Sequence, residues 1–365
     1  MKIAQVAPLY EAVPPRLYGG TERVVANLSD ALVDLGHDVT LFSSADARTR
    51  AKLVPVRDQA IRLDPAPLKS DLAAHMTMLS EVRRLNDRFD VIHFHVDMLH
   101  FPFFEDMPER TLTTIHGRLD VKDLAGVYRR WAKFPLVSIS NAQRTHLPFA
   151  HWAGTVYHGM PQDNYRASVL PQGYLAFLGR ISPEKGPDRA IAIAKRAGMK
   201  LKIAAKVDLV DARYFREEIE PLLDDPLIEF IGEICDADKS DFLGGAEALL
   251  FPIEWPEPFG LVMIEAMACG TPVIAYDRGS APEVVEPGVT GFLVAGEAEA
   301  AEVLDAARRL DRREIRRRFE RRFSSTAMAR GYLELYGRQL AHRPQALRSL
   351  ASAKFEDPHF AARTA

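Results

Sequence analysis

Short apolar runs recur along the chain and are separated by longer segments with helical periodicity. In the first half the runs are KIAQVAP, HDVTLFS, FDVIHFH, RTLTTIHG, PLVSIS and GTVYHG; in the second half they are YLAFLGR, LKIAAKV, LIEFIG, EALLFP, TPVIAY and GFLV. Strands that are apolar almost throughout are buried on both faces, which is typical of a parallel sheet. The alternation therefore predicts a doubly wound α/β architecture that occurs twice in the chain.

The boundary between the two series is predicted in MPQDNYRASVLPQG, residues 160–173, which is rich in Pro, Gln and turn-forming residues. The chain has 365 residues, which suits two domains of roughly 150 residues each. Residues 341–365 lack sustained periodicity, so we expect a loosely ordered tail there.

Composition excludes several classes of protein. Lys and Arg total 47 against 50 Asp and Glu, a formal balance of -3, which gives no support to a nucleic-acid partner. Cys235 and Cys269 are too few for a disulfide framework, so a cytoplasmic location is expected. MKIAQVAPLY does not match a signal peptide, and no apolar run reaches the ~18 residues that span a bilayer. The sequence does not exclude peripheral contact with the inner membrane.

Ligands of doubly wound sheets bind outside the carboxyl ends of the strands, so the residues that follow strands are the ones to examine. Arg180 and Lys185 share the loop LGRISPEKG after the first strand of the second series. Arg offers a planar fork of donors to phosphate oxygens and Lys a point charge, so together they could hold a diphosphate. The alternative is a solvated turn with two surface cations.

A second loop, EPFG, follows the run EALLFP and opens the helical segment LVMIEAMACG. The N-terminus of a helix attracts phosphate through its free N–H groups and its dipole, and Gly260 lets the backbone approach closely. Glu265, one to two turns into the helix, could accept hydrogen bonds from the vicinal hydroxyls of a ribose. The alternative is that Glu257 and Glu265 merely favour the first turns of the helix, but Glu257 precedes Pro258 in the loop.

The first half offers weaker candidates. Gly19 and Gly20 open a loop into a helix in LYGGTERVV, although a plain turn is the usual explanation of a Gly pair. His116 follows the run RTLTTI and could donate to a hydroxyl or carry a proton, or be an ordinary histidine bonded to backbone. His93 and His95 share one strand face, but no further metal ligand is apparent, so no metal site is predicted.

Together, these motifs resemble those of the family 4 retaining glycosyltransferases, which have the GT-B fold. The resemblance rests on LYGGTERVV, TTIHG, SISNAQR, LGRISPEKG and PEPFGLVMIEAMACGTPVIAYDRGSAPEVVEPGVTGFLV, and it extends to about Leu340. Its most specific part is the pair of glutamates Glu257 and Glu265 downstream of Arg180 and Lys185. It implies two Rossmann-like domains facing across a cleft: an acceptor-side domain at 1–165, a donor domain at 166–321, and a helix at 322–340 that packs back toward the first.

The resemblance also implies residue roles. Arg180 and Lys185 would bind the diphosphate of a nucleotide-sugar donor, while Glu265 would hold the ribose. The transferred sugar would contact Glu257 and His116. The implied catalytic set is His116, Arg180, Lys185 and Glu257; the implied donor-binding set is Gly19, Gly20, Arg180, Lys185, Glu257, Phe259, Gly260, Leu261 and Glu265.

The expected reaction is transfer of a sugar with retention to the hydroxyl of a sugar, lipid or small-molecule acceptor. Arg and Lys replace a metal at the leaving group, so the expected reaction is independent of a metal ion. No protein nucleophile or general base is named, and no cofactor is expected beyond the donor. A non-catalytic binding module, a sugar-nucleotide epimerase and a phosphorylase are the alternatives. The paired glutamates speak against the epimerase and the chain length against the phosphorylase.

Overall fold

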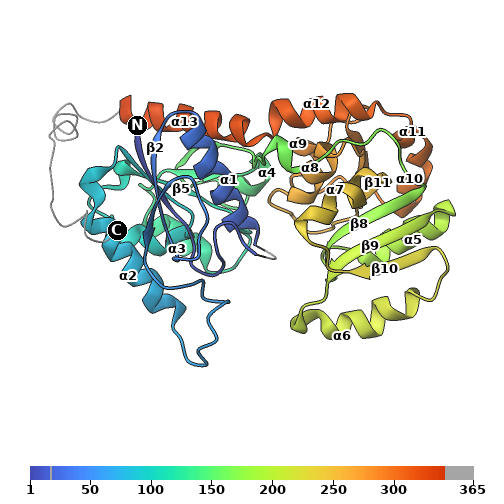
Figure 1. Ribbon diagram of the computed structural model, residues 1–365, viewed down its shortest axis with the longest axis horizontal. Helices are drawn as coiled ribbons and strands as arrows, with labels where there is room; N and C mark the ends of the chain where they lie inside the picture. The colour runs from blue at the N-terminus through green and yellow to red at the C-terminus, as the bar shows by residue number, and fades with distance from the viewer. Residues whose placement is uncertain (17–18, 342–365) are drawn as a thin grey trace.

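The computed structural model describes residues 1–16 and 19–341. The chain forms two halves, each built around one parallel β-sheet, which lie next to each other along the long axis of the molecule (Figure 1). The tail predicted from residue 341 onward lies, apart from Ala341 itself, outside the described residues. The predicted α/β class with two doubly wound sheets is confirmed.

The first sheet has seven parallel strands in the order β3-β2-β1-β4-β5-β6-β7. They are β1 (Lys2–Val6), β2 (Asp38–Ser43), β3 (Lys52–Pro55), β4 (Val91–Phe94), β5 (Thr111–Thr114), β6 (Leu136–Ser138) and β7 (Trp152–Thr155). The apolar pattern did not predict β3, because this short edge strand is only partly buried and lacks a sustained apolar run. It also placed the last strand at 154–159, later than β7.

The second sheet has six parallel strands in the order β10-β9-β8-β11-β12-β13. They are β8 (Tyr174–Arg180), β9 (Lys200–Lys206), β10 (Ile228–Gly232), β11 (Ala246–Phe251), β12 (Val273–Tyr276) and β13 (Gly291–Val294). In both sheets the strand order reverses at the centre, between β1 and β4 and between β8 and β11. Such a switch point separates the loops on either side and leaves a crevice in which ligands bind.

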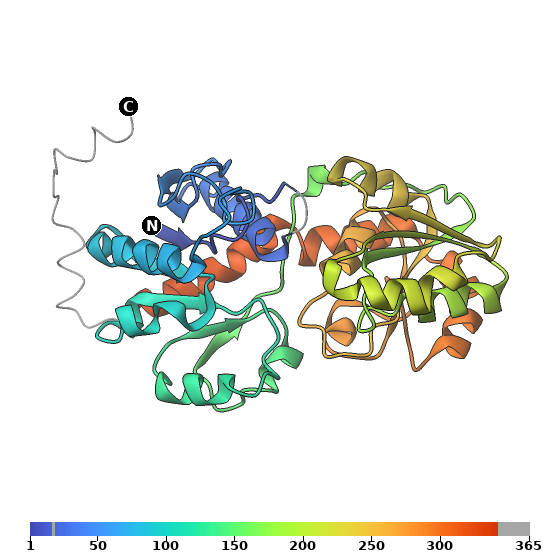
Figure 2. The same cartoon turned by 90° about the horizontal axis from the view of Figure 1, so that it is seen from below.

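Helices cover both faces of each sheet (Figures 1 and 2). They are α1 (Gly20–Asp34), α2 (Asp71–Arg84), α3 (Leu124–Arg130), α4 (Asn141–Arg144), α5 (Pro187–Ala197), α6 (Ala212–Tyr214), α7 (Asp236–Gly244), α8 (Leu261–Ala268), α9 (Ala281–Val284), α10 (Glu297–Glu302), α11 (Leu304–Arg308), α12 (Arg312–Arg322) and α13 (Ser325–Ala341). In α1 the side chains of Val24, Val25, Leu28 and Leu32 recur at helical spacing and are buried against the first sheet.

The chain passes between the halves twice, and the two passages pair with each other. Met160 N donates to Phe323 O at 3.0 Å, and Ser325 N donates to Met160 O at 2.9 Å. A Cβ on Gly159 would lie 2.4 Å from Ser324 O, so only glycine permits this close approach. After the second passage, α13 packs on the first sheet beside α1, with Tyr332 and Tyr336 buried in its core.

Candidate functional site

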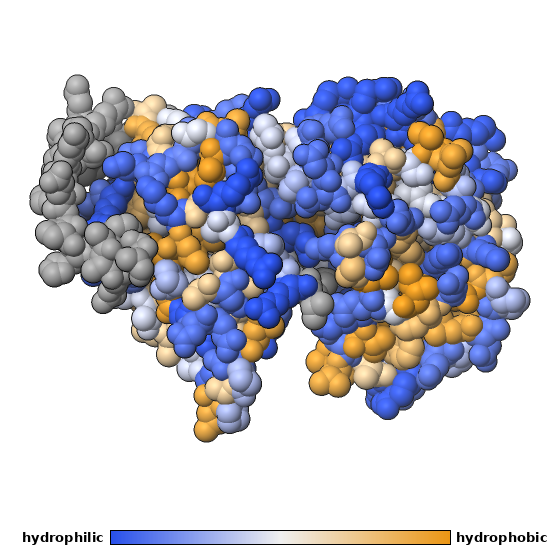
Figure 3. Space-filling model, viewed as in Figure 1, coloured by the Kyte–Doolittle hydropathy of each residue, from blue (hydrophilic) through white to orange (hydrophobic). Residues whose placement is uncertain are grey.

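A cavity of about 360 Å³ lies between the two halves. The surface is hollowed there, and hydrophilic side chains gather along the hollow (Figure 3). Every site residue named from the sequence lines this cavity: Gly19, Gly20, His116, Arg180, Lys185, Glu257, Phe259, Gly260, Leu261 and Glu265. The fold thus brings together residues that are as far apart in the sequence as Gly19 and Glu265.

The N-termini of α1 and α8 meet at the cavity. A Cβ on Gly20 would lie 3.7 Å from Leu261 Cδ1, in ordinary contact across the two halves. Gly260 precedes α8 with φ 77°, and a Cβ there would lie 2.7 Å from Phe251 Cζ. Glycine is therefore required by both conformation and space, and the free N–H groups of the helix remain accessible to an anion.

Arg180 is the last residue of β8, and carboxylates surround it. Its Nη2 donates to Glu184 at 2.7 Å, while Asp208 and Asp211 lie 3.7 and 3.8 Å from Nη1 and Nε. Nε is buried and makes no hydrogen bond within the described part of the chain. Carboxylates thus hold the guanidinium at the wall of the cavity.

Lys185 and Glu257 form an ion pair that joins the loop after β8 to the loop before α8. Both side chains are mostly buried, and Lys185 Nζ lies 5.0 Å from the centre of the Trp255 ring. The carbonyl of Glu257 also accepts from Ser280 N at 3.0 Å. Glu257 is therefore fixed at the cavity by its side chain and by its backbone.

Glu265 is almost completely buried and has two donors on one oxygen. Tyr165 Oη and Lys239 Nζ both donate to Oε1 at 2.9 Å. Burial by itself would lower the pKa of Lys239, but the neighbouring carboxylates of Glu265 and Asp236 outweigh it and raise the pKa overall. Among the described residues Oε2 has no hydrogen-bond partner, so this oxygen is available to a ligand.

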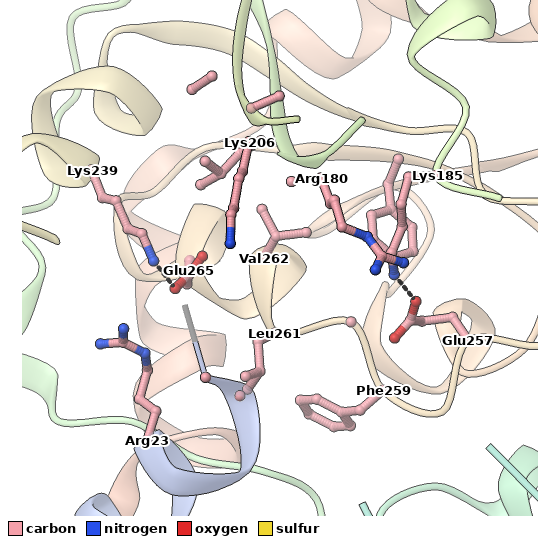
Figure 4. Close-up of a pocket in the computed structure, with 18 of the residues that line it drawn as sticks. Arg23, Arg180, Lys185, Lys206, Lys239, Glu257, Phe259, Leu261, Val262 and Glu265 are labelled. Carbon is pink, nitrogen blue, oxygen red and sulfur yellow. Dashed lines mark hydrogen bonds and ion pairs between the residues drawn. The ribbon is translucent and has the colours of Figure 1, made fainter. Parts of the chain in front are cut away.

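An ion pair crosses from the first half to the second beside Glu265. Arg23, in the first turn of α1, pairs with Asp236 at the start of α7, and Asp236 lies 3.1 Å from Lys239 Nζ. Figure 4 shows Lys239 and Lys206 on the Glu265 side of the cavity, and Arg180 and Lys185 on the Glu257 side. Cations therefore line the cavity along its length, with Glu265 and Asp236 toward one end and Glu257 toward the other.

Three further cations, Arg23, Lys206 and Lys239, line the cavity and are not part of the motifs found in the sequence. Lys206 is the last residue of β9, so the strand-end rule that selected Arg180 applies to it equally. Arg23 and Lys239 lie within helices and reach the cavity only because two sheets face each other. No spacing in the sequence signals them.

His116 lies two residues beyond β5 and lines the cavity with a partly buried side chain. Its Nε2 is 2.8 Å from His95 Nδ1, and its ring stacks on His158 with centroids 5.2 Å apart. Burial lowers the pKa of His116 to about 3, so the ring is neutral. Its Nδ1 is buried and has no hydrogen-bond partner in the described chain.

The ring nitrogens of His93 and His95 are all engaged in hydrogen bonds. His93 lies 2.7 Å from Tyr336 Oη and 2.7 Å from Thr114 Oγ1. His95 lies between His116 and Gln5, each 2.8 Å away. No group of three or more His, Cys, Asp or Glu with the placement of metal ligands occurs in residues 1–16 and 19–341.

Solved structures share the whole architecture. AviGT4, a glycosyltransferase of avilamycin A biosynthesis, superposes with a TM-score of 0.72 at 26% identity over 94% of this chain and 98% of its own. HepE from Anabaena, solved with UDP and glucose, gives a TM-score of 0.69 at 19% identity over 93% of this chain and 100% of its own. Two parallel sheets that face each other across a cationic cleft define a GT-B glycosyltransferase.

Family models and a curated relative agree with this fold. The model for glycosyltransferase family 4 matches residues 18–174, and that for glycosyl transferases group 1 matches residues 163–325. Phosphatidyl-myo-inositol mannosyltransferase from Mycolicibacterium smegmatis is 27% identical over 333 residues, 80% of this chain and 81% of its own. The chain belongs to the family 4 (group 1) glycosyltransferases, a retaining family, and it takes its sugar from a nucleotide-sugar donor. None of the helices among the described residues is long and apolar enough to cross a bilayer.

Proposed function

We propose that this protein transfers a sugar, with retention and without a metal ion, from a nucleoside-diphosphate sugar to an acceptor hydroxyl. One observation carries the proposal: a single cavity holds Arg180, Lys185 and the N-terminus of α8 between Glu257 and Glu265. A sugar nucleotide has the same order of parts, with a ribose at one end, a diphosphate in the middle and a sugar at the other end.

The diphosphate would lie against Arg180, Lys185 and the N–H groups that follow Gly260. Breaking the bond between sugar and diphosphate leaves negative charge on the distal phosphate. Fixed cations and N–H groups aimed at this charge stabilise the transition state, and one such donor contributes about 3–4 kcal/mol. The ion pairs of Arg180 and Lys185 with carboxylates hold these cations in place before the donor arrives.

The two carboxylates would bind the two ends of the donor. Glu265 Oε2, which has no partner among residues 1–16 and 19–341, would accept from ribose hydroxyls, while Tyr165 and Lys239 fix the carboxylate through Oε1. Glu257 would accept from hydroxyls of the transferred ring, next to His116 on the opposite wall. The acceptor would enter from the side of the first half, and its proton would leave with the departing phosphate, so the reaction needs no protein base.

We place the acceptor-side domain at 1–165, the donor domain at 166–321 and the segment that returns to the first half, which contains most of α13, at 322–340. The paired passages at Met160 and Ser324 support these limits, because they are the points where the chain changes halves. A uridine donor is the first to test, since HepE was solved with UDP and glucose. Inositol and phosphatidylinositol are the first acceptors to test, since the M. smegmatis relative is named for phosphatidyl-myo-inositol.

The test begins with thermal shift of the full chain against UDP-, ADP- and GDP-sugars. A ligand that binds only the folded state adds about 2.7 kcal/mol at 100 times its dissociation constant. The donor with the largest shift is then incubated with the acceptors, and the anomeric configuration of the product is read by proton NMR. Transfer with retention supports the proposal. Inversion contradicts it, and binding without transfer or hydrolysis favours the binding module.

A further inference from the structure

Beneath the cavity, a line of buried hydrogen bonds runs from Gln5 to His116. Gln5 is on β1, His95 follows β4 and His116 follows β5, and these three strands are adjacent in the first sheet. Gln5 Oε1 lies 2.8 Å from His95 Nε2, and His95 Nδ1 lies 2.8 Å from His116 Nε2. Gln5 and His95 are buried, so water does not compete for these bonds.

Each hydrogen bond along this line is donated toward Gln5, from His116 to His95 and from His95 to Gln5. Gln5 Nε2 donates to Tyr336 Oη at 3.2 Å, so the amide presents its oxygen to His95. An amide oxygen accepts only, and therefore His95 carries its proton on Nε2. Burial holds the pKa of His95 well below its ordinary value, so the ring is neutral and its Nδ1 accepts from His116 Nε2–H. The remaining nitrogen, His116 Nδ1, is then an unprotonated acceptor.

A second branch of the network is consistent with this direction. Tyr336 has one proton, and His93 Nδ1, 2.7 Å from Tyr336 Oη, accepts it. His93 then carries its proton on Nε2 and donates to Thr114 Oγ1 at 2.7 Å. Tyr336 is thus left to accept from Gln5, as observed. If the Gln5 amide were turned round, the order along the line would reverse, and His116 Nδ1 would become a donor.

We propose that Gln5 and His95 are positioning residues that hold His116 in the tautomer whose Nδ1 accepts a hydrogen bond from a hydroxyl of the donor sugar. The proposal rests on the proposed function, in which His116 contacts that sugar. It also gives Nδ1 a partner, since this nitrogen has none in the described chain although the ring lines the cavity. An acceptor at this point selects donors whose sugar carries a free hydroxyl there and rejects those that lack it.

The test uses three variants of the full chain. Gln5→Met keeps the approximate shape but removes both polar atoms. Gln5→Glu keeps an oxygen that accepts from His95, so it serves as the conservative rescue. Tyr332→Phe is the matched control, because Tyr332 is buried in the same cluster but hydrogen-bonds to Thr114, outside the line from Gln5 to His116.

The first measurement is histidine ¹⁵N NMR without any ligand, with the His116 signals assigned from a His116→Asn spectrum. We expect the parent, Gln5→Glu and Tyr332→Phe to have His116 protonated on Nε2, and Gln5→Met to have a mixture of tautomers. The second measurement is donor hydrolysis, with UDP-glucose or the best donor of the nucleotide-sugar panel. Turnover of Gln5→Met should fall about tenfold, because this is the effect expected when one well-placed hydrogen bond to the transition state is lost. Affinity for UDP alone should not change.

Each unexpected result would contradict a different part of the proposal. A parent protein with His116 protonated on Nδ1 would overturn the direction of the line. Mixed tautomers in Gln5→Met with unchanged turnover would overturn the contact between His116 and the sugar. If Gln5→Met loses turnover but keeps the parent tautomer, Gln5 acts through packing and the proposal is wrong. If no donor is hydrolysed or transferred by the parent, the proposed function fails, whatever the NMR result, and this proposal fails with it.

Discussion

Lys185 and Glu257, from two different loops, are paired in the wall of the cavity. Each holds the other at the place where we propose that the sugar and the distal phosphate meet. A donor phosphate would share the ammonium group with the carboxylate. Loss of either partner should therefore disturb more than one contact with the donor.

Alanine at Arg180 or Lys185 should reduce turnover by about 10²–10³-fold, because each removes a cation that faces the leaving phosphate. The fold should persist, since both residues lie in a loop or at a strand end beside the cavity. Steady-state kinetics and circular dichroism check both points. Lys195→Ala is the control, because Lys195 pairs with Asp225 on the surface of the same half. Parent-like kinetics in both site variants would contradict the proposal that Arg180 and Lys185 bind the diphosphate.

Excess EDTA should leave activity unchanged. Two cations and the N-terminus of a helix already offset the charge of the leaving group, so a divalent ion has no charge left to neutralise. The measurement is the initial rate with and without chelator after extensive dialysis. Loss of the rate and its recovery with a divalent ion would contradict metal independence.

The two glutamates should differ in their kinetic effects. Glu265→Gln should chiefly raise KM, because contacts with ribose are similar in the ground state and the transition state. Glu257→Gln should chiefly lower kcat, because its contact is beside the bond that breaks. Tyr165→Phe is the control for Glu265, since it removes one hydrogen bond and keeps the carboxylate. Equal effects of both glutamine variants on KM alone would reject this division.

Alanine at Gly260 should cost more stability than alanine at Gly288. Both residues have positive φ, 77° and 74°, so each substitution should lower the free energy of unfolding by about 1–2 kcal/mol. A Cβ at Gly288 would meet no atom of the described residues within 4 Å, whereas at Gly260 it would lie 2.7 Å from Phe251 Cζ. Overpacking adds about 1–3 kcal/mol at Gly260. Urea unfolding measures the difference, and equal midpoints for the two variants would contradict it.

His116 should make the protein less stable in acid. Burial lowers its pKa from 6.5 to about 3, so between these values the unfolded chain binds a proton that the folded chain excludes. The free energy of unfolding is therefore not reduced by His116 above pH 6.5. Below that pH it decreases by about 1.4 kcal/mol per pH unit because the unfolded chain binds the extra proton. Urea midpoints from pH 7 to 5 should decline less steeply in His116→Asn than in the parent. His151→Asn, at an exposed position, is the control. Parallel pH profiles would disprove the contribution of His116.

Much of the fold could be predicted because its strands are continuous apolar runs, as in TPVIAY for β12. The same signal fails for β3, an edge strand with partial burial. The site residues at strand ends, such as Arg180, could be named because a parallel sheet brings its carboxyl ends together. Lys239 and Tyr165 could not, because they reach Glu265 from a helix and a passage between halves, and only tertiary packing brings them there.

The return of α13 to the first sheet also bears on how the chain folds during synthesis. The second sheet and its helices are continuous in sequence, so they can close as soon as α12 has left the ribosome. The first sheet must wait for Tyr332 and Tyr336, more than 300 residues after β1, before its core is full. Although it is translated first, the acceptor side is therefore expected to mature last. A protein truncated before α13 should expose the apolar surface of the first sheet, and it is the form of this protein that a chaperone would recognise.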